Sequence, residues 1–264
     1  MTGEPEPKSH LLVTGVARSG TTAMGELLNS HSKICLGVER FKFQFLRANV
    51  FDPSLFERDR FFDFRPEDTN LDPEARPAWQ PVYDRMAEKW DNATIVGDKV
   101  PDMMPVLSDF MRANPDFKAI CLLRNLKDVA LSWQARANRA RDSWPAGKGF
   151  AVACASWEEQ HKVLHDLMRD KSLREHVLLL DYDKIYENPG QTEAAILAFL
   201  GLAPEPEFTR ILNRHAAFVL ARKLRKVPKE YIDAYKAVDQ SHVRGLRKVA
   251  REQLEIWSQQ SRPQ

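Results

Sequence analysis

A glycine-bounded loop at residues 15–22 constrains this chain more than any other feature of its sequence. The loop reads Gly-Val-Ala-Arg-Ser-Gly-Thr-Thr, follows the apolar run Leu-Leu-Val at 11–13 and precedes a segment of helical composition. In a strand, loop and helix of this kind, backbone N–H groups of the loop and the first helical turn point at an anion, and the helix dipole adds to their attraction. The loop therefore predicts a phosphate-binding site between a buried strand and a helix.

The spacing of Gly15, Gly20 and Thr22 matches the nucleotide P-loop pattern G-x-x-x-x-G-K-[ST] at every fixed position except one. Thr21 stands where that pattern has the lysine that contacts the β- and γ-phosphates, and the loop's cation is Arg18 instead. We therefore expect a nucleotide with a 5′-phosphate rather than a nucleoside triphosphate with magnesium. The alternative is ordinary turn and cap chemistry, in which glycine and threonine also take part.

Short apolar runs alternate with helical segments along most of the chain. This alternation predicts an α/β fold with a central parallel sheet flanked by helices on both faces, a three-layer P-loop-like architecture. The expected strands cover residues 10–14, 32–37, 94–97, 117–123 and 176–180. The expected helices cover residues 20–30, 81–90, 103–114, 126–141, 151–170, 189–200, 207–221 and 240–259.

The length of 264 residues and the hydrophobic content of 43% suffice for one large core. We expect a disordered leader at residues 1–9 and a single domain at 10–264. Two stretches have the character of lid or substrate-binding insertions. One is 50–81, with several prolines and the aromatic run at 61–64, and the other is 136–150, which mixes aromatic and basic side chains.

Charge and composition narrow the class of protein. The formal net charge of +2 is nearly balanced, which argues against a nucleic-acid partner. The sequence shows neither a membrane span nor a secretory signal, so we expect a cytoplasmic protein. Cys35 and Cys121 lie in apolar runs and are expected in the core, and neither cysteines nor histidines are spaced as metal ligands.

In a parallel α/β sheet the ligand binds beyond the carboxyl ends of the strands. Six charged or aromatic side chains lie at or just beyond the ends of expected strands in this sequence, so we expect one edge of the sheet to bring them together. They are Arg18, Glu39, Asp98, Lys99, Arg124 and Tyr182.

A second motif begins where the fourth expected strand ends. Arg124 is followed eight residues later by Ser132, two turns into the next helix. The guanidinium group offers a fork of charge-assisted donors and the serine a hydroxyl, so the two can converge on one anion. Alternatively, Arg124 pairs with Asp128 or caps a neighbouring helix, and Ser132 is an ordinary helical residue.

Together, the two motifs resemble those of the sulfotransferases that use 3′-phosphoadenosine 5′-phosphosulfate (PAPS). The Arg-Ser-Gly-Thr-Thr form of the loop is similar to the 5′-phosphosulfate-binding loop of tyrosylprotein sulfotransferases and many bacterial relatives, and Arg124 with Ser132 is similar to the family's 3′-phosphate pair. The resemblance implies PAPS as donor, adenosine 3′,5′-bisphosphate as product, and no metal. The cofactor-binding residues that it implies are Arg18, Ser19, Gly20, Thr21, Thr22, Arg124, Ser132 and Tyr182.

The resemblance also implies a general base. Gly-Val-Glu at 37–39 resembles the Gly-Glu-Glu stretch of the tyrosylprotein branch, in which a glutamate takes the proton of the acceptor. Val38 replaces the first glutamate, so Glu39 is the candidate in this tripeptide. The alternative is a solvated carboxylate that pairs with Arg40 or Lys42.

Two cations complete the catalytic set that the resemblance implies. Asp-Lys-Val-Pro at 98–101 is similar to the strand end of the same branch whose lysine, here Lys99, acts on the leaving group. Arg18 would stabilise the charge that develops during transfer. The alternative for Lys99 is a surface cation beside Asp98.

The resemblance covers residues 10–40, 94–135 and 176–201. Its last block contains Leu-Asp-Tyr-Asp followed by Asn-Pro, which looks like the family's strand, Tyr-Glu, proline and helix pattern. This makes Tyr182 a candidate cofactor contact, although Asp183 departs from the usual glutamate.

The family often places a late basic loop over the 3′-phosphate. Two clusters, at 222–226 and 244–248, could serve, and the sequence does not choose between them. A solvated basic face is the alternative for either cluster.

The activity implied is in-line transfer of a sulfuryl group to a hydroxyl of an acceptor, with an amine as the lesser alternative. A small molecule, a glycan or a peptide would fit the acceptor equally, because cofactor motifs constrain the donor alone. Two other functions stay open: a P-loop kinase with a degenerate loop, and a non-catalytic nucleotide-binding protein. The first requires ATP and magnesium, and the presence of both Glu39 and Lys99 argues against the second.

Overall fold

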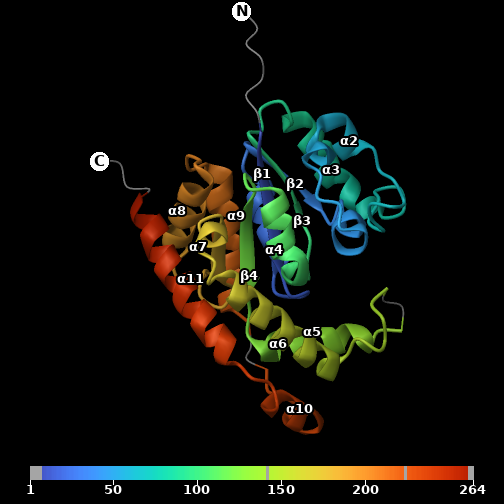
Figure 1. Ribbon diagram of the computed structural model, residues 1–264, viewed down its shortest axis with the longest axis vertical. Coiled ribbons are helices and arrows are strands. Elements are labelled where there is room, and N and C mark those ends of the chain that lie inside the picture. Colours follow the sequence, from blue (N-terminus) through green and yellow to red (C-terminus); the bar gives the residue numbers. More distant parts are fainter. Residues whose placement is uncertain (1–7, 141–142, 223–224, 261–264) are drawn as a thin grey trace, which may run out of the picture.

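The computed structural model describes residues 8–140, 143–222 and 225–260 (Figure 1). Five strands form one parallel sheet in the order β2-β3-β1-β4-β5, which confirms the predicted α/β fold. Their apolar runs are buried on both faces, as parallel sheets require. The strands are β1 (Ser9–Gly15), β2 (Ile34–Val38), β3 (Ile95–Lys99), β4 (Lys118–Leu123) and β5 (Val177–Asp181).

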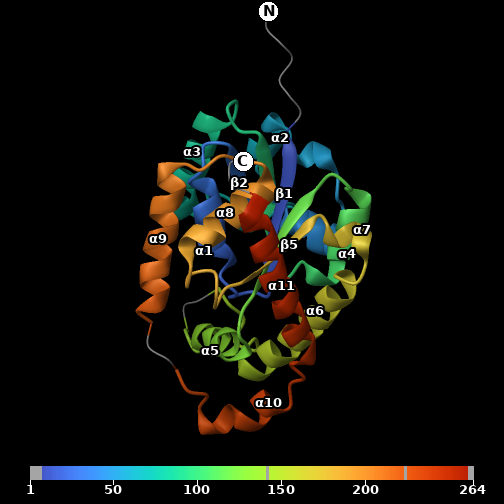
Figure 2. The same ribbon diagram turned by 90° about the vertical axis from the view of Figure 1, so that its left-hand side faces the viewer.

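Helices cover both faces of the sheet. In Figure 2, α1, α8 and α9 lie on one side of the strands and α4, α6 and α7 on the other, while α11 crosses in front of β5. The strand side chains alternate accordingly: Leu11 and Val13 pack on the α1 side and Leu12 on the α4 side. The helices are α1 (Thr21–Asn29), α2 (Arg58–Phe62), α3 (Gln80–Lys89), α4 (Met104–Ala113), α5 (Leu126–Ala137), α6 (Phe150–Leu167), α7 (Lys171–Arg174), α8 (Pro189–Leu200), α9 (Pro206–Leu220), α10 (Ile232–Lys236) and α11 (Ser241–Gln260).

The strand registers align the carboxyl ends of the strands. Lys99 at the end of β3 pairs with Val38 of β2 and Val13 of β1, and Leu123 of β4 pairs with Asp181 of β5. The loops that leave the strands therefore start from a common edge. This confirms the expectation that one edge of the sheet collects the six residues at the strand ends.

Several boundaries differ from the sequence-based expectation. Helix α5 ends at Ala137, short of the predicted 141, which lies outside the described residues with 142. The short helices α7 and α10 were not expected; Asp170 starts the former by accepting a hydrogen bond from the Ser172 N–H at 3.1 Å. The leader was expected to cover residues 1–9, of which 1–7 lie outside the described residues. Strand β1 begins at Ser9, the last residue of that expected leader.

The segment at 50–81 is tied to the core by a buried ion pair. Arg40, fully buried, donates from Nη1 to Asp68 Oδ2 at 2.8 Å and from Nε to the Phe61 carbonyl oxygen at 2.8 Å. Phe61 is itself fully buried in the core. Trp79, at the end of this segment, lines a cavity.

Side-chain amides bind the outer edges of the sheet. Asn29 accepts from the Leu36 N–H of β2 at 2.8 Å and donates to the Leu36 carbonyl oxygen at 2.7 Å. On the opposite edge, Gln253 of α11 accepts from the Leu179 N–H at 2.9 Å and donates to the Val177 carbonyl oxygen at 2.7 Å. Each amide thus imitates one residue of a further strand.

The cysteines Cys35, Cys121 and Cys154 are buried and unpaired, and the first two lie in strands as expected. Burial raises the pKa of Cys35 to about 11. Within the part of the chain that the structure describes, no helix has the length and apolar character needed to cross a membrane.

Candidate active site at the carboxyl edge of the sheet

The loop between β1 and α1 is held from both sides by remote side chains. Asp102 Oδ1 accepts the Ala17 N–H at 2.7 Å, and the Trp133 indole N–H donates to the Ala17 carbonyl oxygen at 2.8 Å. Gly20 starts α1 with φ 107°, and a Cβ there would overlap the ring of Tyr182. Glycine is therefore required at this position both by backbone conformation and by space.

Two buried polar atoms beside this loop have no hydrogen-bond partner among the described residues. They are Ser19 Oγ and Arg124 Nε. Buried donors are normally satisfied, so these two atoms leave donor capacity for a ligand. Both atoms can donate to an anion, which fits the phosphate groups of a nucleotide.

The second motif lies against the first. Arg18 Nε donates to Ser132 Oγ at 3.0 Å, and Arg124 Nη1 donates to the Arg18 carbonyl oxygen at 2.9 Å. The Arg124 guanidinium also lies over the Tyr182 ring, 4.5 Å from its centroid. The structure thus brings together four of the residues that the sequence predicted for the cofactor: Arg18 from the loop after β1, Arg124 directly after β4, Ser132 from α5 and Tyr182 directly after β5.

Three arginines surround one carboxylate next to this site. Asp128 lies 3.8 Å from Arg124, 3.7 Å from Arg222 and 3.6 Å from Arg225. Burial acts to raise the pKa of Asp128, but a hydrogen bond from Asn125 and the arginines lower it below its usual value. The pairing of Arg124 with Asp128, one alternative for this motif, is present together with the contact to the loop.

The two C-terminal basic clusters differ in position. Arg222 and Arg225 reach Asp128, whereas residues 223 and 224 lie outside the described residues. Arg247, from the cluster at 244–248, pairs instead with Asp181 at 3.1 Å and Asp183 at 3.0 Å. The cluster at 222–226 is therefore the one whose arginines stand beside Arg124.

Glu39 and Lys99 form an ion pair at the end of β2 and β3. Lys99 Nζ lies 3.2 Å from Glu39 Oε1, and Lys42 Nζ lies 3.0 Å from Glu39 Oε2. Lys99 is only 2% exposed, so it is not the surface cation of the alternative interpretation. Burial acts to raise the pKa of Glu39, but Lys99 and Lys42 lower it below its usual value. The lowered pKa keeps the carboxylate ionised at neutral pH.

Asp98 holds the turn that carries Glu39. Its two carboxylate oxygens accept the N–H groups of Arg40 at 3.0 Å and Phe41 at 2.8 Å. Glu39 itself has φ 53°. This left-handed conformation is unfavourable in free energy for any residue other than glycine. Full burial raises the pKa of Asp98 to about 6, although both backbone hydrogen bonds oppose the shift.

Sequence reasoning missed the residues that position these loops. Gln160 of α6 donates to Asp102 Oδ1 at 2.9 Å, and the Trp157 indole N–H donates to the Arg124 carbonyl oxygen at 2.9 Å. Trp133 and Trp157 are both buried in the core. The available signal was that a buried indole N–H needs a partner, and a nearby loop carbonyl is a common one.

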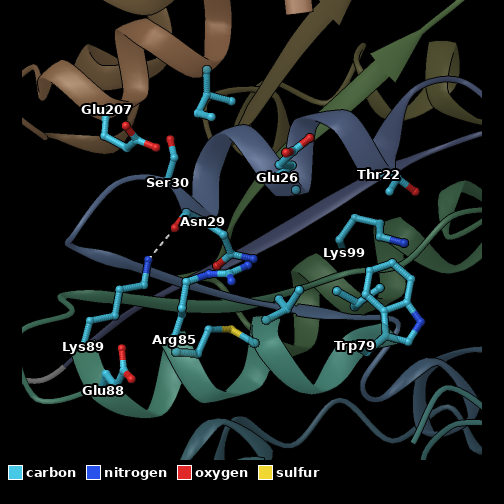
Figure 3. A pocket seen from close by; sticks show the side chains of 15 residues that line it. Thr22, Glu26, Asn29, Ser30, Trp79, Arg85, Glu88, Lys89, Lys99 and Glu207 are labelled. Atoms are coloured by element: carbon cyan, nitrogen blue, oxygen red, sulfur yellow. Dashed lines mark hydrogen bonds between the residues drawn. The ribbon is translucent and has the colours of Figure 1, made fainter. Parts of the chain in front are cut away.

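A cavity of about 840 Å³ opens beside Lys99 and Thr22, between α1 and α3 (Figure 3). Trp79 lies on its lower side in that view, and Val82 and Met86 of α3 also line it. Among the described residues of the two insertions expected at the acceptor site, Trp79 of 50–81 lines this cavity, and none from 136–150 does.

The described residues contain no cluster of three or more His, Cys, Asp or Glu side chains suited to hold a metal ion. His161 is buried, and its Nδ1 lies 2.6 Å from the Trp157 carbonyl oxygen. Burial lowers its pKa to about 4. It therefore stays neutral at physiological pH.

Solved structures similar to this chain include several sulfotransferases. The sulfotransferase domain from the curacin biosynthetic pathway has 18% identity and a TM-score of 0.52, over 93% of this chain and 98% of that one. The sulfotransferase domain of the Synechococcus PCC 7002 olefin synthase has 16% identity and a TM-score of 0.52, over 94% and 96%. Sulfotransferase STF1 of Mycobacterium tuberculosis H37Rv has 18% identity and a TM-score of 0.50, over 81% and 76%. These similarities establish the fold.

The family assignment comes from the sequence. No curated protein matches the chain. The sequence model of the sulfotransferase family matches residues 10–206, which include the loop at 15–22, Glu39, Lys99 and the motif from Arg124 to Ser132. The chain belongs to the sulfotransferase family.

Proposed function

We propose that this protein transfers a sulfuryl group from PAPS to a hydroxyl group of an acceptor, with an amine as the lesser alternative. The observation that carries the proposal is the Glu39–Lys99 pair, 3.2 Å apart, at the same sheet edge as the phosphate loop. Members of the family catalyse sulfuryl transfer; the donor, the base and the acceptor group are the parts that we propose.

The donor site in this proposal has two parts. Loop amides, Ser19 Oγ and Arg18 bind the 5′ end, and Arg124, Ser132 and Tyr182 bind the 3′ end. The orphaned Ser19 Oγ and Arg124 Nε support this assignment, because both would gain an anionic acceptor. When bound, PAPS supplies the sulfuryl group and leaves as adenosine 3′,5′-bisphosphate.

Arg222 and Arg225 would cover the 3′ side, since they already lie next to Arg124 around Asp128. On the loop side, Gly20, Thr21 and Thr22 would contribute the amides of the first helical turn of α1. In this proposal residues 10–264 act as one domain.

Glu39 acts as the general base. Its ionised carboxylate takes the proton of the acceptor hydroxyl while the acceptor oxygen forms a bond to sulfur. The bond from sulfur to the bridging phosphate oxygen breaks, and that oxygen keeps the electron pair. A positioned base of this kind contributes about two to four orders of magnitude to the rate.

Lys99 and Arg18 stabilise the charge that gathers on the leaving group. The Lys99 ammonium is nearly excluded from water, which strengthens its electrostatic effect on a neighbouring anion. In this proposal it also moves a proton towards the bridging oxygen. Lys42, on the other oxygen of Glu39, keeps that carboxylate ionised and oriented.

A comparison of two nucleotides tests the donor assignment. Isothermal calorimetry should show tight binding of adenosine 3′,5′-bisphosphate without metal, and weaker binding of ATP with or without magnesium. Radiolabelled PAPS should transfer its label to a hydroxyl compound in an acceptor panel. Stronger binding of ATP would favour the kinase alternative, and bisphosphate binding without transfer to any acceptor would favour the non-catalytic one.

A further inference from the structure

The cavity between α1 and α3 has two chemically different walls. The α3 wall presents Val82 and Met86, and Trp79 lies beside them near Lys99 (Figure 3). The α1 wall presents the polar side chains of Glu26, Asn29 and Ser30. A volume of about 840 Å³ falls in the range of small-molecule sites, about 300–1,000 Å³. The cavity suits a ligand with one apolar and one polar face.

One end of this cavity meets the proposed donor site. Thr22 and Lys99 line the cavity and also belong to the residues predicted for PAPS binding and leaving-group stabilisation. The α1 wall runs from Thr22 to Asn29, a rise of about 10 Å at 1.5 Å per residue. A ligand that fills the cavity would therefore hold one end at Lys99 and the other about 10 Å away.

Two cations lie at the far end. The Lys89 Nζ donates to the carbonyl oxygens of Asn29 and His31, both at 2.7 Å. Burial, and to a smaller degree the nearby charge of Arg85, lower the pKa of Lys89 to about 8, although other neighbouring groups oppose the shift. Arg85 makes no hydrogen bond or ion pair with the described residues. Two neighbouring like charges, neither paired with a carboxylate, form a site where an anionic group is stabilised.

The acidic residues of the cavity do not cancel this site. Glu26 is paired with Arg214 and with His215, and Glu207 with Arg210. The third, Glu88, is exposed on α3. Among the described residues neither Arg85 nor Lys89 forms an ion pair with a carboxylate, although the more distant charge of Glu205 acts on Lys89.

We propose that this cavity binds the acceptor, and that the acceptor is an amphipathic molecule whose hydroxyl lies at Lys99 and whose anionic group lies between Arg85 and Lys89. The apolar body of the acceptor packs on Trp79, Val82 and Met86. This inference rests on the proposed sulfuryl transfer and names the substrate class for it.

Matched pairs of probes test the charge preference. ω-Hydroxyalkanoic acids of increasing chain length are compared with diols of the same length, which lack the carboxylate, as acceptors for radiolabelled PAPS. The wild-type protein should prefer the acid about 10- to 100-fold in kcat/KM, the value of a charge-assisted hydrogen bond. Arg85→Gln should abolish the preference, and Arg251→Gln, an exposed arginine on α11, should keep it. Equal use of acid and diol, or a preference that survives Arg85→Gln, overturns the proposal.

A binding measurement covers the case in which neither probe is sulfated. The acids are titrated into protein saturated with adenosine 3′,5′-bisphosphate, and Val82→Trp, which fills the cavity, should abolish their binding while bisphosphate affinity stays within about twofold of wild type. Bisphosphate binding without acid binding overturns the cavity proposal alone. Failure of the bisphosphate to bind overturns the donor assignment, and the cavity proposal falls with it.

Discussion

The two halves of the sheet edge hold their charges in different ways. On the β2–β3 half, Glu39 is fixed by a buried lysine and by a turn that Asp98 secures through two backbone hydrogen bonds. On the β4–β5 half, Asp128 stands among three arginines at 3.6–3.8 Å, beyond hydrogen-bond distance. The first half is built for one geometry. In the second half, the proposed function has an arriving phosphate replace the carboxylate among the three arginines.

This difference has a chemical reason. A proton acceptor must lie within a few tenths of an ångström of its working position, whereas a phosphate ligand tolerates side chains that adjust around it. The short turn from Glu39 to Phe41 is therefore buried and backbone-bonded, while Arg222 and Arg225 are 30% and 41% exposed. Changes in the first half should affect turnover, and changes in the second should affect affinity.

Glu39→Gln should give the largest effect. The amide cannot accept the proton, so kcat should fall by about 10²- to 10⁴-fold. The affinity for adenosine 3′,5′-bisphosphate should stay nearly unchanged, because Glu39 lies on the other half of the edge. Turnover is measured with radiolabelled PAPS and product affinity by calorimetry.

The matched control is Glu175→Gln, an exposed glutamate beyond α7, which should behave as wild type. A Glu39→Gln variant with wild-type turnover would remove Glu39 from the role of base. A variant that lost bisphosphate affinity as well would show that the two halves are not independent.

Asp98→Asn should have a smaller effect on kcat, about 10- to 100-fold, through misplacement of Glu39. Asparagine offers one acceptor oxygen for the two N–H groups of Arg40 and Phe41. Since the pKa of Asp98 is raised to about 6, the wild-type kcat should also fall as the pH drops through that value, and this limb should vanish in the variant. KM for the donor should change little. An unaltered pH profile would reduce Asp98 to a purely structural role.

Asp98 should also change how the stability of the protein depends on pH, in a direction that follows from its raised pKa. Burial raises the pKa of Asp98 from 3.8 to about 6, so between these values the folded protein binds more protons than the unfolded chain. The tighter proton binding of Asp98 in the folded protein therefore adds its whole contribution to the free energy of unfolding below pH 4. This contribution is lost as the pH rises through about 6. Urea titrations should show a more positive slope of stability against pH for Asp98→Asn than for wild type in this window. Parallel curves would contradict the raised pKa.

Asp128→Asn should give the smallest effect and the opposite sign. Releasing three arginines from a partly exposed carboxylate should raise bisphosphate affinity by about two- to fivefold, the value of exposed ion pairs. The gain should shrink at high salt. Calorimetry at two salt concentrations measures the gain in affinity and its dependence on salt. The control is Asp109→Asn, because the Asp109 carboxylate lies 3.8 Å from Arg112, away from this site. A tenfold loss of affinity would mean that Asp128 orders the arginines instead of competing for them.

The fold was largely predictable because its signals are local. Apolar runs located all five strands, and their shared carboxyl edge followed from the parallel arrangement. The proximity of Arg18, Ser132 and Arg124 was predictable as well, because each stands at a strand end or in the following helix.

The supports of the site were not predictable because their partners are remote. Asp102 reaches Ala17 across 85 positions in the chain, and Trp133 reaches the same residue across 116. Lys99 was expected to act on the leaving group, but a surface cation stayed open as the alternative, since a lone lysine gives no sign of burial until its carboxylate partner is placed next to it. Long-range pairing of this kind has no periodic signature in a sequence.

The two side-chain amides bound to the outer strands affect whether another copy of this protein can add a strand to the sheet. An open strand edge is a template on which another chain can add a strand, the usual route to aggregation. Here Asn29 takes the outward N–H and C=O of Leu36, and Gln253 takes the Leu179 N–H and the Val177 C=O at the far edge. Strand addition at either border would first have to displace an amide. The two amides thereby protect the part of each edge strand that they occupy.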